Sequence, residues 1–353
     1  MQALAAAPAV PAPLWLVDIL HPLTLVLHFV AMNVLVAAAF VLATARAGER
    51  EMQRAAAGLL PPSFSMTVTL GVAPLLFLQL VHGERFYASS IHMAWPWIGV
   101  LFVLMGGYYA AYAVGGRLER GREASVALRA LPFMALLVFS FVLAANVSLS
   151  EHPEAMAALG RPGWNLGLAD TNVLLRWSHE IVGAIALGSL VFLVRGAFRR
   201  PHDAELAASF DRRGLGVLVG ATVVAVLLGV GQLLARPGDV GGARAGASLG
   251  IGIVLGLLVP FLAWRHVRRP SLRSLVLVLA AGVGVLVAKV LLRLAVRARR
   301  LAAAGIEPPP QADVDVGPIV LFAVMLLVAI GCMAWLVRVA LRAAATTTPS
   351  ETP

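Results

Sequence analysis

The residues of this chain best placed for chemistry are histidines within or beside long apolar segments, where ionisable groups are costly and mark candidate sites. They are His21, His28, His82, His92 and His179, and Glu180 follows the last of them. His21 and His28 are seven residues apart, so a helix would place both on one face, about 10 Å apart. Imidazoles inside a helical bundle can ligate the iron of b-type haem, or they can be hydrogen-bonded core histidines. The sequence leaves both interpretations open for His28 and His179.

Segment 82–92 holds a high density of polar groups between two apolar runs. It reads His-Gly-Glu-Arg-Phe-Tyr-Ala-Ser-Ser-Ile-His and is expected to form a turn at the outer membrane interface. In such a turn, Arg85 could pair with a haem propionate or a quinone oxygen, with His82 and His92 beside it. The alternative is a capped turn whose polar groups satisfy one another.

A row of basic residues ends the eighth expected helix. Its members are Lys289, Arg293, Arg297 and Arg300. Their spacings of four, four and three residues put them on one helical face. Two interpretations remain open: the side chains reach out to the membrane interface, or the face holds anionic groups such as haem propionates or lipid phosphates.

The segments that must position these residues are long and apolar. Hydrophobic residues make up 60% of the 353 positions and charged residues 13%, far from the balance of a soluble domain. Helices of near or above ~20 residues, enough to cross a bilayer, are expected at 14–45, 63–82, 91–115, 128–149, 172–197, 214–235, 246–265, 272–296 and 316–341. The predicted fold is an all-α polytopic membrane protein with about nine transmembrane helices.

The expected arrangement is two four-helix bundles and one peripheral helix. Residues 1–197 are expected to form an N-terminal bundle that carries the candidate haem site. Residues 198–342 are expected to form a C-terminal bundle with the last helix, followed by a disordered tail at 343–353.

The net charge of +10 comes largely from arginines in short loops, so it indicates membrane topology and not a nucleic-acid partner. The odd-numbered loops carry three or four arginines each, and the second, fourth and sixth loops one or two; the basic row that ends the eighth expected helix is the exception. This alternation predicts an outer N-terminus and a cytoplasmic C-terminus in a bacterial inner membrane. Cys332 is the only cysteine, which excludes an internal disulfide, an iron–sulfur cluster and covalent c-type haem attachment.

Over about residues 15–197, an ordered set of motifs resembles subunit I of the cytochrome bd quinol oxidases. The motifs are His28-Phe29, the Leu-Gly-Val-Ala of 70–73, Gly83…Phe86-Tyr87…Ser89, Ala144-Ala145-Asn146 before Pro153, and Trp177-Ser178-His179-Glu180 with Gly188 and Phe192. The resemblance implies that His28 is similar to the axial ligand of a high-spin haem. It also implies that His179 is similar to a ligand of the low-spin b haem.

The chain departs from this family at three places. The third expected helix contains no glutamate, expected helices six to eight contain no methionine, and the loop after the sixth is short. These departures argue against oxygen reduction and against the family's quinol site. We expect a b-haem subunit that passes electrons between the quinone pool and partner cytochromes of a respiratory complex. A haem-free quinone-binding anchor and a non-redox transporter are the alternatives.

Overall fold

The computed structural model describes residues 9–10, 12–46, 48–152, 155–156, 163–166, 171–307 and 309–311, and part of 316–339. The chain divides into two compact units, Met1–Val17 with Pro309–Pro353, and Asp18–Pro308. In the first unit, the Val10 N–H donates to the Pro310 carbonyl over 2.8 Å. The second unit contains every candidate site residue.

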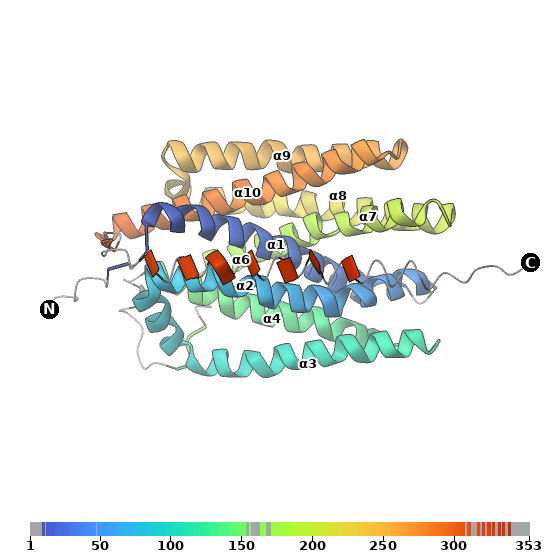
Figure 1. Cartoon of the computed structure of the whole chain (residues 1–353), viewed down its shortest axis with the longest axis horizontal. Coiled ribbons are helices and arrows are strands. Elements are labelled where there is room, and N and C mark those ends of the chain that lie inside the picture. Colours follow the sequence, from blue (N-terminus) through green and yellow to red (C-terminus); the bar gives the residue numbers. More distant parts are fainter. Residues whose placement is uncertain are drawn as a thin grey trace, which may run out of the picture. The chain divides into compact units, whose positions relative to one another are not determined.

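Long helices make up nearly all of the described second unit (Figure 1). They are α1 (Leu14–Thr44), α2 (Arg50–His92), α3 (Ala94–Glu119), α4 (Val126–Ser150), α6 (Thr171–Gly188), α7 (Leu190–Arg199), α8 (Ala204–Ala235), α9 (Ala243–Arg268) and α10 (Leu272–Ala303), with the 3₁₀ helix η1 (Pro237–Val240). Helices α6 and α7 form one span, broken at Ser189. The described residues contain 8 segments long and apolar enough to cross a membrane. The predicted all-α polytopic membrane protein is therefore confirmed.

The helices pack in two groups that share α6, α7 and α8. One apolar cluster joins α1, α2, α3 and α4 to one side of α6–α8, with Leu42, Leu60 and Phe192 at its centre. A second cluster joins α6–α8 to α9 and α10. A third contact sets Phe29 of α1 against Val290 of α10. Helix α1 therefore lies against α2, α6 and α10. Each of these three helices carries candidate site residues.

The expected boundary between the second and third helices was wrong. Helix α2 runs on through 82–92 to His92, so this polar segment is helical and not a turn. His82 alone has non-helical dihedrals there (φ −133°, ψ 26°), and the chain bends at this residue. Inside a helix the backbone N–H and C=O groups hydrogen-bond to one another. In a turn at the membrane these groups would need other partners. Pro61 and Pro62 lie inside α2, which begins at Arg50 and not at the expected residue 63.

Other expectations lie at the limit of the described residues. The ninth expected helix, 316–341, is described only in part, and its described positions up to Val339 are helical. The expected tail 343–353 lies outside the described residues. The division of the membrane bundle near residue 197 remains a prediction.

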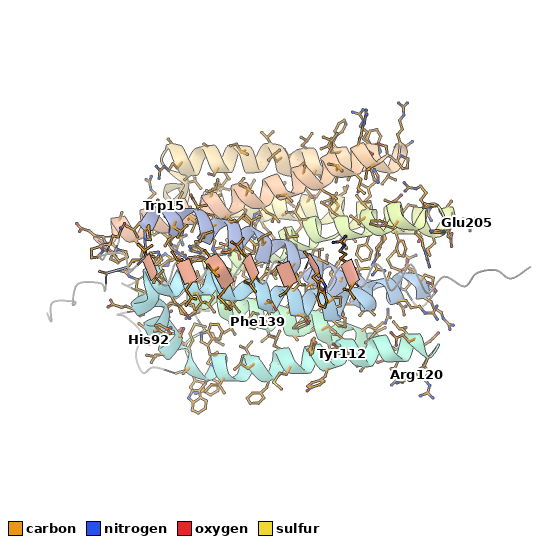
Figure 2. All side chains as sticks on the ribbon, in the orientation of Figure 1. Trp15, His92, Tyr112, Arg120, Phe139 and Glu205 are labelled. Carbon is orange, nitrogen blue, oxygen red and sulfur yellow. The ribbon has the colours of Figure 1, made fainter. Side chains whose placement is uncertain are left out.

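The second unit has two ends, which we name after a buried residue at each. The Glu151 end is where α2, α4 and α10 finish and α6 begins. The Arg129 end is where α1, α3 and α7 finish and α2, α4 and α8 begin. Figure 2 shows His92 at the Glu151 end, and Arg120 and Glu205 at the Arg129 end.

Candidate functional site

His28 is fixed to α2 by a hydrogen bond from its ring. Its Nδ1 lies 3.0 Å from the carbonyl oxygen of Thr67. Since a carbonyl only accepts, Nδ1 must carry the proton, and Nε2 keeps its lone pair. The ring also lies against Gly71, where an added Cβ would fall 2.9 Å from Cε1. Glycine at this position therefore makes room for the imidazole beside the helix backbone.

His179 repeats this arrangement in the other half of the unit. Its Nδ1 lies 2.9 Å from the carbonyl oxygen of Ala225 on α8. A Cβ added at Gly229 would fall 3.2 Å from its Cε1. In both contacts the glycine follows the carbonyl residue by four positions. Neither Nε2 has a hydrogen-bond partner in the part of the chain that the structure describes.

The helices that carry these two histidines cross tightly. A Cβ added at Gly188 of α6 would overlap the carbonyl of Asn33 on α1 and fall 2.7 Å from the Cβ of Ala37. Counted along each axis, His28 lies about 7 Å and His179 about 13 Å from this crossing, both toward the Glu151 end. The crossing therefore fixes the two imidazole-bearing segments relative to each other.

The basic face of α10 points into the bundle and not out to the interface. Arg297 is 7% exposed. The Nζ of Lys289 lies 4.6 Å above the ring of Phe29, next to His28, and the Lys289 charge also acts on His179. Arg293 Nη1 lies 3.4 Å from Glu180 Oε1. The interpretation of this face as side chains reaching for the interface was wrong.

A buried carboxylate, Glu151, holds the outer part of this face. Arg297 Nε donates to it over 3.1 Å, and Arg300 Nη1 over 2.8 Å. Arg176 of α6 approaches to 3.4 Å, and Arg300 also pairs with Asp239 of η1 at 2.5 Å. Burial raises the pKa of the Glu151 carboxyl, but the surrounding guanidinium groups lower it more, to about 2. Glu151 is therefore ionised throughout the physiological pH range.

His21 and His82 lie in the same region from α1 and α2. His21 is 9% exposed, and its ring stacks on Phe77 with centroids 6.0 Å apart. The charge of Arg297 acts on both imidazoles, and His21 acts electrostatically on His82. The structure thus brings four predicted histidines of three helices toward the basic face of α10. The four histidines are His21, His28, His82 and His179.

Arg85 and His92 lie farther along α2 than His82, and the charge of Arg85 acts on His82. They lie seven residues apart on the last segment of α2, on one face of that segment. The buried Nη1 of Arg85 and the buried Nδ1 of His92 have no hydrogen-bond partner in the described ranges. His92 is held through its carbonyl, which accepts from the N–H groups of Gly163 and Asn165. Of the three predicted quinone-binding residues, Arg85 and His92 therefore each have a buried side-chain nitrogen without a hydrogen-bond partner in the described ranges.

Sequence reasoning missed Glu151, Arg176 and Asp239. A basic row on one face of a membrane helix requires counter-charges, and that signal could have directed attention to carboxylates at the ends of other spans. It placed Gly71 in the Leu-Gly-Val-Ala motif of 70–73 without connecting it to His28, and it did not single out Gly229 among the 33 glycines of the chain.

The site is compatible with a group that needs only axial ligands. The described residues contain no cluster of three or more His, Cys, Asp or Glu side chains able to hold a metal ion. A haem is different, because one or two imidazoles suffice to hold its iron. Neither a protein-family model nor a curated protein matches this chain. Fold and site together define an all-α polytopic membrane protein with two carbonyl-anchored histidines beside an inward basic face.

Proposed function

We propose that this protein is a b-haem membrane subunit of a respiratory electron-transfer complex, passing electrons between the quinone pool and partner cytochromes. The observation that carries the proposal is the repeated contact of His28 and His179. Each donates Nδ1–H to a helix carbonyl and keeps Nε2 unpaired in the described structure. A backbone carbonyl on the other ring nitrogen is the usual support of a metal-ligating histidine, because it fixes the tautomer and the ring orientation.

The residues present fit a haem in donor chemistry and in charge. Nε2 of His28 and of His179 would each ligate an iron, which supplies one-electron transfer when bound. Five cations line the region: Arg176, Lys289, Arg293, Arg297 and Arg300. Three carboxylates oppose them, Glu151, Glu180 and Asp239. The difference, five minus three, leaves two positive charges, which matches the two propionate groups of one haem. Lys289 and Arg293 are the nearest of these cations to the two anchored histidines.

The first experiment is an absorption spectrum of the purified full chain with His28→Ala and His179→Ala variants. We expect a reduced-minus-oxidised b-type spectrum in the wild type. Each variant should lose its own part of that spectrum. The matched control is His202→Ala, because His202 is exposed at the Arg129 end. A wild-type protein without haem, or the same spectrum in all three variants, would contradict the proposal.

A sharper test moves the imidazoles without removing them. Gly71→Ala and Gly229→Ala place a methyl group against His28 and His179, and the ring must shift. We expect each to alter the band assigned to its own histidine, and Gly71→Ala to have the larger effect, because its contact is closer by 0.3 Å, 2.9 against 3.2 Å. Gly58→Ala on α2 and Gly220→Ala on α8 are matched controls, since an added Cβ meets no atom within 4 Å at either position.

A haem-free quinone anchor is the second candidate. It is favoured by the unpartnered buried nitrogens of Arg85 and His92. A guanidinium and an imidazole can together hold the two oxygens of a quinone head group. Quinone that co-purifies with haem-free wild type, and is lost in Arg85→Gln but kept in Arg117→Gln, would favour this candidate over the first.

We further propose that the Arg129 end faces the cytoplasm of a bacterial inner membrane, with the N-terminus outside. The arginines of this end lie in loops and in the adjoining ends of the helices, where they count as topology signals. The basic face of α10 lies near the opposite end, but its three arginines are paired with Glu151, Glu180 and Asp239. Reporter fusions after residue 121 and after residue 240 test this: only the first should report a cytoplasmic position.

A further inference from the structure

A second basic cluster, at the Arg129 end, has no part in the proposed function. It surrounds a pocket between the start of α2, the end of α3 and the start of α4. The polar residues of its wall are Arg50, Gln53, Arg54, Arg122, Glu123 and Arg129. The enclosed space of about 30 Å³ has room for about two water-sized groups. It can therefore receive the oxygens of a small anion whose remainder stays outside.

Arg129 makes this pocket more than a group of surface charges. Its side chain is buried, at 4% exposure. Its Nη1 donates to the carbonyls of Leu42 and Ala45, over 3.3 and 2.6 Å, and so satisfies the end of α1. Its Nε is buried and has no partner in the described structure. A buried guanidinium donor without an acceptor is costly, so a ligand oxygen there would be favourable.

The charge of the pocket wall also favours an anion. Four arginines of the wall oppose Glu123 of the wall and Glu51 beside it, so four minus two leaves two positive charges. Arg50 pairs with Glu123 at 3.0 Å and Arg54 with Glu51 at 2.5 Å. All four of these side chains are at least 44% exposed, so both pairs are weak and can be exchanged for another anion. Arg122 has no carboxylate partner among the described residues.

We propose that this pocket binds a phosphate group, carried by the headgroup of an anionic phospholipid or present as free phosphate. Guanidinium groups match the oxygens of phosphate with paired N–H donors. The pocket lies at the ends of three membrane-spanning helices, where lipid headgroups lie. Basic pockets between helices on the cytoplasmic side are known places for anionic headgroups.

The experiment uses the purified full chain and two probes. Native mass spectrometry measures retention of phosphatidylglycerol against phosphatidylcholine after mixing with micelles of each. Thermal unfolding with added sodium phosphate, at constant ionic strength against sodium chloride, measures free phosphate. A preference for phosphatidylglycerol assigns the site to a lipid, and stabilisation by phosphate alone assigns it to the free ion. The absence of both would overturn the proposal.

Variants of the wall make the assignment specific. Arg54→Gln and Arg122→Gln should each weaken binding about fivefold, whereas Glu123→Gln, which removes the competing carboxylate, should strengthen it. Arg120→Gln is the matched control, because Arg120 is exposed on the same loop and does not line the pocket. Equal losses in Arg120→Gln and Arg122→Gln would also overturn the proposal. Arg129 is left unchanged because it caps α1.

Discussion

The two ends of the membrane bundle use arginine in opposite ways. At the Glu151 end, Arg297 and Arg300 turn inward onto a carboxylate that is 4% exposed. At the Arg129 end, Arg50 and Arg54 lie in exposed pairs at the surface. Arg297 and Arg300 therefore neutralise a buried carboxylate, whereas Arg50 and Arg54 pair with carboxylates that water reaches. Burial of the carboxylate decides which role the arginine takes, because water screens exposed charges and not buried ones.

The largest effect should come from breaking the buried network. Glu151→Gln leaves Arg297, Arg300 and Arg176 without their shared anion. We expect the free energy of unfolding to fall by about 3 kcal/mol, as for other buried pairs that lose one partner. Chemical denaturation of the purified protein in detergent measures this. Glu123→Gln is the control, since its pair is exposed and should be worth under about 0.5 kcal/mol. Similar losses in both variants would remove the distinction between the two ends.

The dependence of stability on pH should further distinguish the Glu151 end from the Arg129 end. The pKa of Glu151 is lowered to about 2 in the folded protein, so its stabilising contribution is complete above its unfolded pKa of about 4.3 and is lost as pH falls toward 2. The stability difference between wild type and Glu151→Gln should therefore be constant from pH 8 to pH 5 and shrink below about pH 4. Unfolding temperatures across this range measure it. A difference that already changes between pH 7 and pH 5 would contradict the low pKa.

One buried carboxylate at the Arg129 end tests whether burial or location decides the effect. Asp211 of α8 is 3% exposed and pairs with Arg200. Asp211→Asn should cost about 1.5 kcal/mol, less than Glu151→Gln, because Arg200 is 30% exposed and can be solvated instead. Glu205→Gln, exposed on the first turn of the same helix, is the control. No cost for Asp211→Asn would mean that location and not burial separates the ends.

The smallest effect concerns salt. Raising the ionic strength from about 0.05 to 1 M should remove the few tenths of a kcal/mol contributed by the Arg50–Glu123 pair. The cost of Glu151→Gln should remain almost unchanged, because its partners are shielded from solvent. Denaturation of both variants and of wild type at the two salt concentrations measures this. A strong salt dependence of the Glu151→Gln cost would show that water reaches the network.

The sequence by itself determined the all-α membrane class, the eight described spans and the candidates His28 and His179. Hydropathy and helix length are local properties, so a single chain reveals them. The sequence did not reveal that 82–92 continues α2, since Gly83 and the polar residues after it also suit a turn. Whether this segment continues as a bent helix or reverses in a turn depends on which of its polar groups the neighbouring helices can hydrogen-bond.

Only the tertiary structure decided which groups meet. Arg297 and Glu151 are 146 residues apart in the chain, and their contact depends on how α4 and α10 pack. The glycines that admit the two imidazoles, Gly71 and Gly229, have the same local pattern as many others. Each of these glycines matters because an imidazole of another helix packs against it. The sequence of neither segment alone specifies which helix that is.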